Sequence, residues 1–74
     1  MTFYVEVFTS STGKKQNERV VTRRSCQSLA AVNDALAALW PSARLDSHQL
    51  ENLPQSFFEP IGDGTAYRGV RVRK

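Results

Sequence analysis

Residues 67–74 have the sequence Tyr-Arg-Gly-Val-Arg-Val-Arg-Lys, and the alternation in this stretch decides which fold we expect. Successive side chains of an extended strand point to opposite faces. Val70 and Val72 therefore share one face, whereas Arg71 and Arg73 share the other with the tyrosine. The stretch predicts a strand that packs its valines on a core and offers cationic side chains to an acidic surface.

A β-hairpin is predicted at the start of the chain. Thr2–Thr9 alternates and is rich in the aromatic and β-branched residues that strands favour. Because both of its faces carry large apolar side chains, we expect this strand to be central in the sheet. Residues 10–17 are polar and contain a glycine, which is typical of a loop between antiparallel strands, and Glu18–Arg24 forms the returning strand. Lys14 and Lys15 make the hairpin tip cationic.

The clearest element is a helix over Ser28–Trp40. The hydroxyl of Ser28 can accept a hydrogen bond from a free amide of the first turn. Apolar residues at helical spacing share one face of this helix: Leu29, Val32, Leu36, Leu39 and Trp40. Pro41 cannot continue the ladder of backbone hydrogen bonds, so the helix is expected to end before it.

A second hairpin is predicted near the C-terminal end. An apolar segment that begins with Phe57 and Phe58 leads to Gly62-Asp63-Gly64, which the strand of residues 67–74 follows. An Asp-Gly pair between two extended segments is a strong hairpin signal, because glycine reaches positive φ without steric cost.

Residues 43–55 fit a short strand, one helical turn opened by Ser47, or a packed loop, and we expect a short strand at Arg44–Ser47 followed by a turn. The fold class is therefore α+β, with residues 1–74 as a single domain. The domain contains a four- or five-stranded antiparallel sheet, with the helix packed on one face and the element order β-β-α-(β)-β-β.

One helix covers only one side of a sheet, so the other side is left open. The side chains expected to face the helix are Phe3, Val5, Val7, Val70 and Val72. Those expected on the open side are Tyr4, Glu6, Phe8, Tyr67, Arg71 and Arg73. Two interpretations of this aromatic and basic surface stay open. It can bind a partner, or Arg71 and Arg73 can pair with Glu6 and lie over Tyr4 or Phe8 within the chain.

We expect partner binding to involve the aromatic and basic side chains of the open side, the second and last strands and the hairpin tip. These residues are Tyr4, Phe8, Lys14, Lys15, Arg23, Tyr67, Arg68, Arg71 and Arg73. A protein partner is the first hypothesis, because interfaces favour aromatic residues and arginine, and it can bind either the open side or an edge strand of the sheet by adding a further strand. Single-stranded nucleic acid or RNA is the alternative, since rings stack on bases and cations pair with phosphates. A homodimer formed through the same surface is a further option.

Composition and motifs give no sign of catalysis. The net charge of +3 favours anionic partners. His48 is the only histidine and Cys26 the only cysteine, so neither a disulfide nor a thiolate-rich metal site can form, and a nucleophile would lack its usual base and oxyanion site. The lysines at the hairpin tip lack the spacing of a phosphate-binding loop. We expect no catalytic residue, no cofactor and no metal ligand.

The N-terminal residues lack the basic start and apolar core of a signal peptide, and no apolar run approaches the roughly 20 residues of a membrane span. A single free cysteine fits a reducing compartment. We expect a soluble, cytoplasmic protein that does not bind membranes.

In size and strand order, the whole chain resembles the compact accessory proteins encoded by phages and mobile elements, including anti-CRISPR inhibitors. The resemblance is one of layout, and no motif carries it, so it assigns no role to any residue. It implies a small non-catalytic protein that occupies a surface of a host protein or nucleoprotein complex in the host cytoplasm. Many such inhibitors mimic nucleic acid with acidic surfaces, and the basic charge of this chain departs from that pattern.

Overall fold

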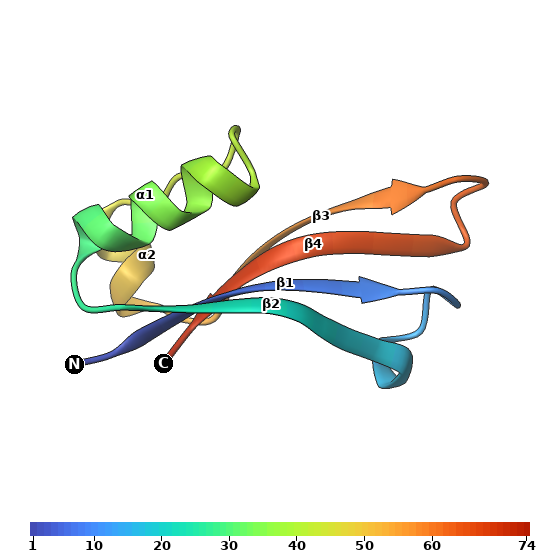
Figure 1. Cartoon of the computed structure of the whole chain (residues 1–74), viewed down its shortest axis with the longest axis horizontal. Coiled ribbons are helices and arrows are strands. Elements are labelled where there is room, and N and C mark those ends of the chain that lie inside the picture. The colour runs from blue at the N-terminus through green and yellow to red at the C-terminus, as the bar shows by residue number, and fades with distance from the viewer.

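Four antiparallel strands form a single sheet with α1 packed on one face, as predicted. The computed structural model describes all 74 residues. Its elements are β1 (Phe3–Ser10), the short 3-10 helix η1 (Lys15–Asn17), β2 (Glu18–Cys26), α1 (Leu29–Leu39), α2 (Ser47–Glu51), β3 (Gln55–Ile61) and β4 (Ala66–Arg73). The strand order is β2-β1-β4-β3, so the first and last strands of the chain lie side by side at the centre (Figure 1).

The alternation of apolar residues explains the place of β1. Val5 is paired with Val72 of β4 and Val7 with Val70, so the valines of both central strands share the face that α1 covers. The opposite face of β1 carries Phe8, which is also buried. A strand with apolar side chains on both faces gains most from a central position, and this prediction is confirmed.

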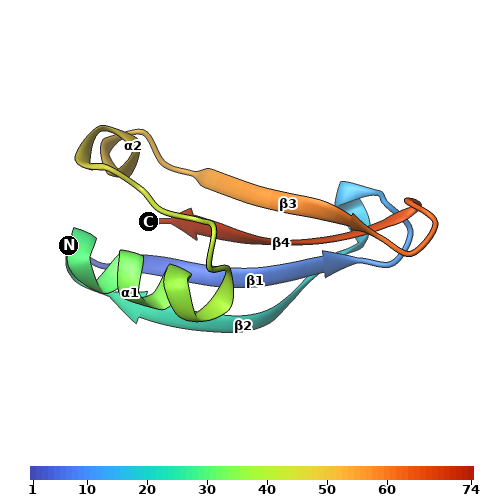
Figure 2. The ribbon, with the colours of Figure 1, turned by 90° about the horizontal axis from the view of Figure 1, so that it is seen from above.

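The main core lies between α1 and one half of the sheet. Ser28 caps the helix by accepting a hydrogen bond from the Ala31 amide at 3.1 Å, as predicted. Val32 and Leu36 are completely buried against the sheet. The strands extend well past the end of α1 (Figures 1 and 2), so the far half of the sheet has no helix over either face.

The predicted strand at Arg44–Ser47 is wrong, and the sheet has four strands, the smaller of the two numbers predicted. A short helix, α2, forms here instead. Asp46 accepts a hydrogen bond from the Gln49 amide at 2.8 Å, and the Gln49 side chain accepts one from the Asp46 amide at 3.0 Å. This reciprocal capping box satisfies two amides that a helix start would otherwise leave free.

The segment before α2 is fixed to α1 by one side chain. The Asn33 amide group donates to the Leu45 carbonyl and accepts from the Leu45 amide, both at 2.9 Å. Leu45 is buried as a result and belongs to the core. Because both backbone groups of this residue are occupied by Asn33, they are not available for a strand ladder.

Cys26 ends β2 as a buried thiol. Burial raises the pKa of this thiol above its ordinary value of 9.0, and the nearby charge of Arg24 only partly offsets the effect. We therefore expect Cys26 to react with a disulfide reagent such as DTNB far more slowly in the native protein than in denaturant. Absorbance at neutral pH measures both rates, and equal rates would contradict the buried position.

Candidate partner-binding face

The face of the sheet opposite α1, here called the open face, has the membership that the sequence predicted. Paired residues of neighbouring antiparallel strands lie on the same face. Tyr4 is opposite Arg73, Glu6 opposite Arg71, and Ser10 opposite Tyr67. No helix packs on this face as α1 packs on the other (Figure 1), although the first hairpin turn covers Ser10, which is completely buried.

Glu6 is the centre of an ion-pair network on the open face. Its side chain is only 1% exposed and lies within 4.0 Å of three guanidinium groups. Arg23 donates from Nε at 2.7 Å and Arg73 from Nε at 2.9 Å, while Arg71 Nε lies 3.6 Å away. Burial would raise the pKa of Glu6, but the hydrogen bonds from Arg73 and Arg23 outweigh it and hold the pKa below 4.5.

The same arginines lie over aromatic rings. The guanidinium carbon of Arg73 is 4.8 Å from the centre of the Tyr4 ring, and that of Arg71 is 4.8 Å from the centre of the Phe8 ring. Gly69 stands opposite Phe8, where an added side-chain carbon would come within 2.7 Å of the Phe8 ring. The interpretation as cross-strand packing within the chain is confirmed, and we call Glu6 with its arginines and rings the arginine layer.

Glu18 holds the edge of this layer at the start of β2. It accepts a hydrogen bond from the Tyr67 hydroxyl at 2.6 Å and one from Arg71 at 3.2 Å. The hydrogen bond to Glu18 raises the pKa of Tyr67 above 10.0. Burial would raise the pKa of Glu18 itself, but the bonds from Tyr67 and Arg71 outweigh it and lower that pKa below 4.5.

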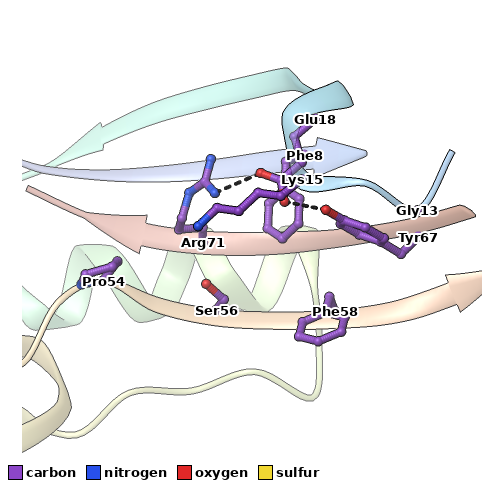
Figure 3. Close-up of a pocket in the computed structure, with 9 residues that line it drawn as sticks. All are labelled: Phe8, Gly13, Lys15, Glu18, Pro54, Ser56, Phe58, Tyr67 and Arg71. Atoms are coloured by element: carbon purple, nitrogen blue, oxygen red, sulfur yellow. Dashed lines mark hydrogen bonds and ion pairs between the residues drawn. The ribbon is translucent and has the colours of Figure 1, made fainter. Parts of the chain in front are cut away.

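A hollow of about 430 Å³ opens beside these groups, and we call it the aromatic hollow. Figure 3 shows the side chains around it: Phe8, Lys15, Glu18, Ser56, Phe58, Tyr67 and Arg71, with Gly13 and Pro54 at its margin. Phe58 of β3 is 69% exposed, and its ring centre lies 5.9 Å from that of Tyr67. A large apolar side chain therefore remains in solvent next to polar groups that are already fixed.

The first hairpin places a cation at this hollow. Ser10 donates a hydrogen bond to the Lys14 carbonyl at 2.9 Å, which fixes the turn that leads into η1. Lys15 begins η1 and extends across the hollow toward Arg71 (Figure 3). Lys15 forms no ion pair within the chain, unlike Arg71.

The predicted binding residues divide into three groups. Phe8, Lys15, Tyr67 and Arg71 come together at the aromatic hollow, while Tyr4, Arg23 and Arg73 belong to the arginine layer.

Two predicted residues lie elsewhere. Arg68, predicted as a binding residue of the last strand, is on the α1 side, where it pairs with Glu59 at 3.0 Å and lies over the Trp40 ring, so it is not part of the open face. Strand alternation puts Arg68 on the same side as Val70, which could have shown this. Lys14 is exposed but does not line the hollow.

Three residues of the site were not predicted from the sequence: Phe58, Ser56 and Glu18. Two phenylalanines in succession must point to opposite faces of a strand, and Phe57 packs against the core, which leaves Phe58 on the open face. Alternation alone could have shown that one ring is exposed, but not which one.

The lowered pKa values predict a loss of stability in acid. A carboxyl group whose pKa is lower in the folded protein than in the unfolded chain stabilises the folded state at any pH above the pKa of the unfolded chain. This stabilisation is lost as the pH falls through the lower pKa of the folded protein. We expect the thermal unfolding midpoint to fall steeply below pH 4.5, where Glu6 and Glu18 become protonated. Circular dichroism melts of the wild type and of Glu6→Gln measure this. A variant with the same acid slope as the wild type would contradict the role of Glu6.

The residues with catalytic potential are dispersed. His48 is exposed on α2, and Cys26 is buried at the end of β2. No group of three histidine, cysteine or acidic side chains lies close enough together to hold a metal ion. None of the helices has the length and apolar character that crossing a membrane requires.

Comparison of the chain with protein-family models, with curated proteins and with solved structures finds no match in any of the three.

Proposed function

We propose that the chain is a small, non-catalytic protein-binding module whose open face occupies a surface of a partner protein. The observation that carries this proposal is the exposed ring of Phe58 beside the aromatic hollow. Binding energy at interfaces is concentrated in a few aromatic and arginine side chains near a pocket. Arg71 and the neighbouring rings are already held in place, so a partner would meet a preorganised surface.

The sheet edges are poorer docking sites than the open face. At the β2 edge, Val7 pairs with Thr22 but Phe8 pairs with Val20, so Val21 bulges out of the ladder. Three arginines also lie on β2, and β3 at the other edge contains Pro60, which has no backbone N–H to offer a further strand. Bulges, charges and prolines at edges are devices that oppose the addition of a further strand.

A protein partner fits the open face better than single-stranded nucleic acid. Base stacking needs free ring faces. The rings of Tyr4 and Phe8 lie beneath guanidinium groups, and Phe8 is only 3% exposed. The arginines are already paired with Glu6 and Glu18, which leaves less charge for phosphates.

Phe58→Ser tests the proposal against a matched variant, Val21→Ser. Both side chains are large, apolar and exposed, 69% for Phe58 and 64% for Val21, but Val21 lies on the far edge strand. We expect Phe58→Ser to weaken partner binding by about thirtyfold or more, the loss typical of a hot spot of about 2 kcal/mol. Quantitative affinity capture from an extract of the source cells, followed by titration of the purified partner, measures this.

Retention of every partner by Phe58→Ser would overturn the proposal, as would equal losses for both variants. Charge reversal of Arg71 and Arg73 is a less decisive test, because it also destroys the pairing with Glu6. A partner that proves to be a second copy of the chain would appear as a concentration-dependent dimer in sedimentation.

A further inference from the structure

The aromatic hollow continues into a second hollow along the open face. The second hollow has a volume of about 410 Å³, and Pro54 and Arg71 line both. Arg73, Lys74, Glu51 and Leu53 complete its walls, and we call it the basic hollow. Together the hollows form a groove that follows β4 from Tyr67 to Lys74. The seven residue steps from Tyr67 to Lys74 span roughly 23 Å at about 3.3 Å per residue, which is more than enough for an extended segment of about five residues.

The charge of the groove is positive and unevenly placed. Four cationic side chains line it, Lys15, Arg71, Arg73 and Lys74, against the two carboxylates Glu18 and Glu51. Glu6, which balances part of the arginine charge, is buried below the surface. A ligand in the groove therefore meets apolar rings at one end and an excess of cations along the rest.

We infer that the groove binds an extended acidic peptide segment of the partner. One apolar or aromatic side chain of the segment would enter the aromatic hollow against Phe58. Its carboxylates would lie near Lys15 and Lys74, the two cations of the groove that form no ion pair within the chain. This inference rests on the proposed function and adds the chemistry of the partner. Lys15 has no carboxylate of its own within 4.0 Å, so it gains an ion pair on binding without losing one.

The carboxylate of Glu18 in the aromatic hollow favours a peptide over a nucleic acid strand. It lies 3.2 Å from Arg71, and the charge of Lys15 also acts on it, so this hollow holds two cations against one carboxylate and has one positive charge in excess. One extra positive charge matches one carboxylate, whereas a polynucleotide would bring a phosphate at every step past Glu18 and Glu51.

The test uses a synthetic pentapeptide, blocked at both ends, with a central phenylalanine, one glutamate on either side of it and a glycine at each end. Titration into the 15N-labelled protein at low salt should shift the amide signals of Lys15, Ser56, Phe58 and Arg71. A peptide with alanine in place of phenylalanine should bind about tenfold more weakly. A peptide with lysines in place of the glutamates should produce no saturable shift.

Matched protein variants locate the contact. Lys15→Gln should weaken binding of the acidic peptide by about two- to fivefold, the range of an exposed ion pair, and Lys14→Gln should leave it unchanged. Both lysines are exposed, but only Lys15 lines the aromatic hollow. Neither substitution touches the arginine layer, so both variants should keep the wild-type unfolding midpoint.

Shifts confined to other surfaces, equal binding of acidic and basic peptides, or tighter binding of an oligothymidine of similar length would each overturn the inference. These results are separable from failure of the proposed function. If Phe58→Ser loses the natural partner but the wild-type protein does not bind the acidic peptide, the open face is still the docking site. In that case only the inference that the partner supplies an acidic segment is wrong.

Discussion

Glu6→Gln is expected to lower the free energy of unfolding by about 2–4 kcal/mol, a large part of the stability of so small a domain. The substitution keeps the volume of the side chain but removes the charge that three guanidinium groups share. Breaking a buried ion pair from one side is costly because the partner charges lose their compensation. The expected loss lies below the full cost of a buried pair because the arginines remain partly exposed. Urea unfolding followed by circular dichroism measures the difference.

Glu59→Gln is the matched control for this prediction. Glu59 pairs with Arg68 at 3.0 Å, but both side chains are about half exposed. An exposed pair contributes about 1 kcal/mol or less, so the control should change stability little. Equal effects of the two substitutions would show that the arginine layer is an ordinary surface ion-pair cluster and would contradict its structural role.

Leu36→Ala is expected to destabilise the protein by about 2–5 kcal/mol. Leu36 is completely buried and lies at the centre of the contact between α1 and the sheet. Removing it leaves a cavity in the only core that the helix covers, and a chain of 74 residues has little other apolar burial to compensate.

Leu39→Ala provides the comparison within the same helix, because Leu39 is only partly buried. The decrease in the free energy of unfolding should be smaller for Leu39→Ala than for Leu36→Ala by at least about 1 kcal/mol. Guanidinium chloride unfolding of both variants measures this difference. If the two substitutions cost the same, α1 does not pack on the sheet through the Leu36 side, and the assignment of covered and open faces would be wrong.

Strand alternation was sufficient to predict which residues share a face. The period of two needs no knowledge of neighbouring strands, so the open face with Tyr4, Phe8, Arg71 and Arg73 could be predicted from the sequence. It also predicted that Glu6 and the C-terminal arginines can meet. The pairing of Arg23 with Glu6 depends on the register between β1 and β2. The bulge at Val21, which lies between the hairpin turn and Arg23, shifts this register by one residue.

The aromatic hollow could not be predicted, because its walls come from segments that are distant in the chain. Lys15 reaches it through the conformation of the first hairpin turn, and Pro54 through the connection after α2. The helix α2 itself was visible in the sequence, since Asp46 and Gln49 have the spacing of a capping box. The leucines of this segment fit a strand equally well, and that ambiguity produced the wrong expectation.

The proposed function requires that a partner protein binds the sheet face that α1 leaves uncovered. Hydroxyl-radical footprinting of the chain, free and in complex with its captured partner, shows which face is covered. We expect oxidation of Phe58 and Tyr67 to fall several-fold in the complex, while oxidation of the exposed Val21 on β2 stays unchanged. Protection of Val21 or of Trp40 on the α1 side, with Phe58 still fully reactive, would contradict it.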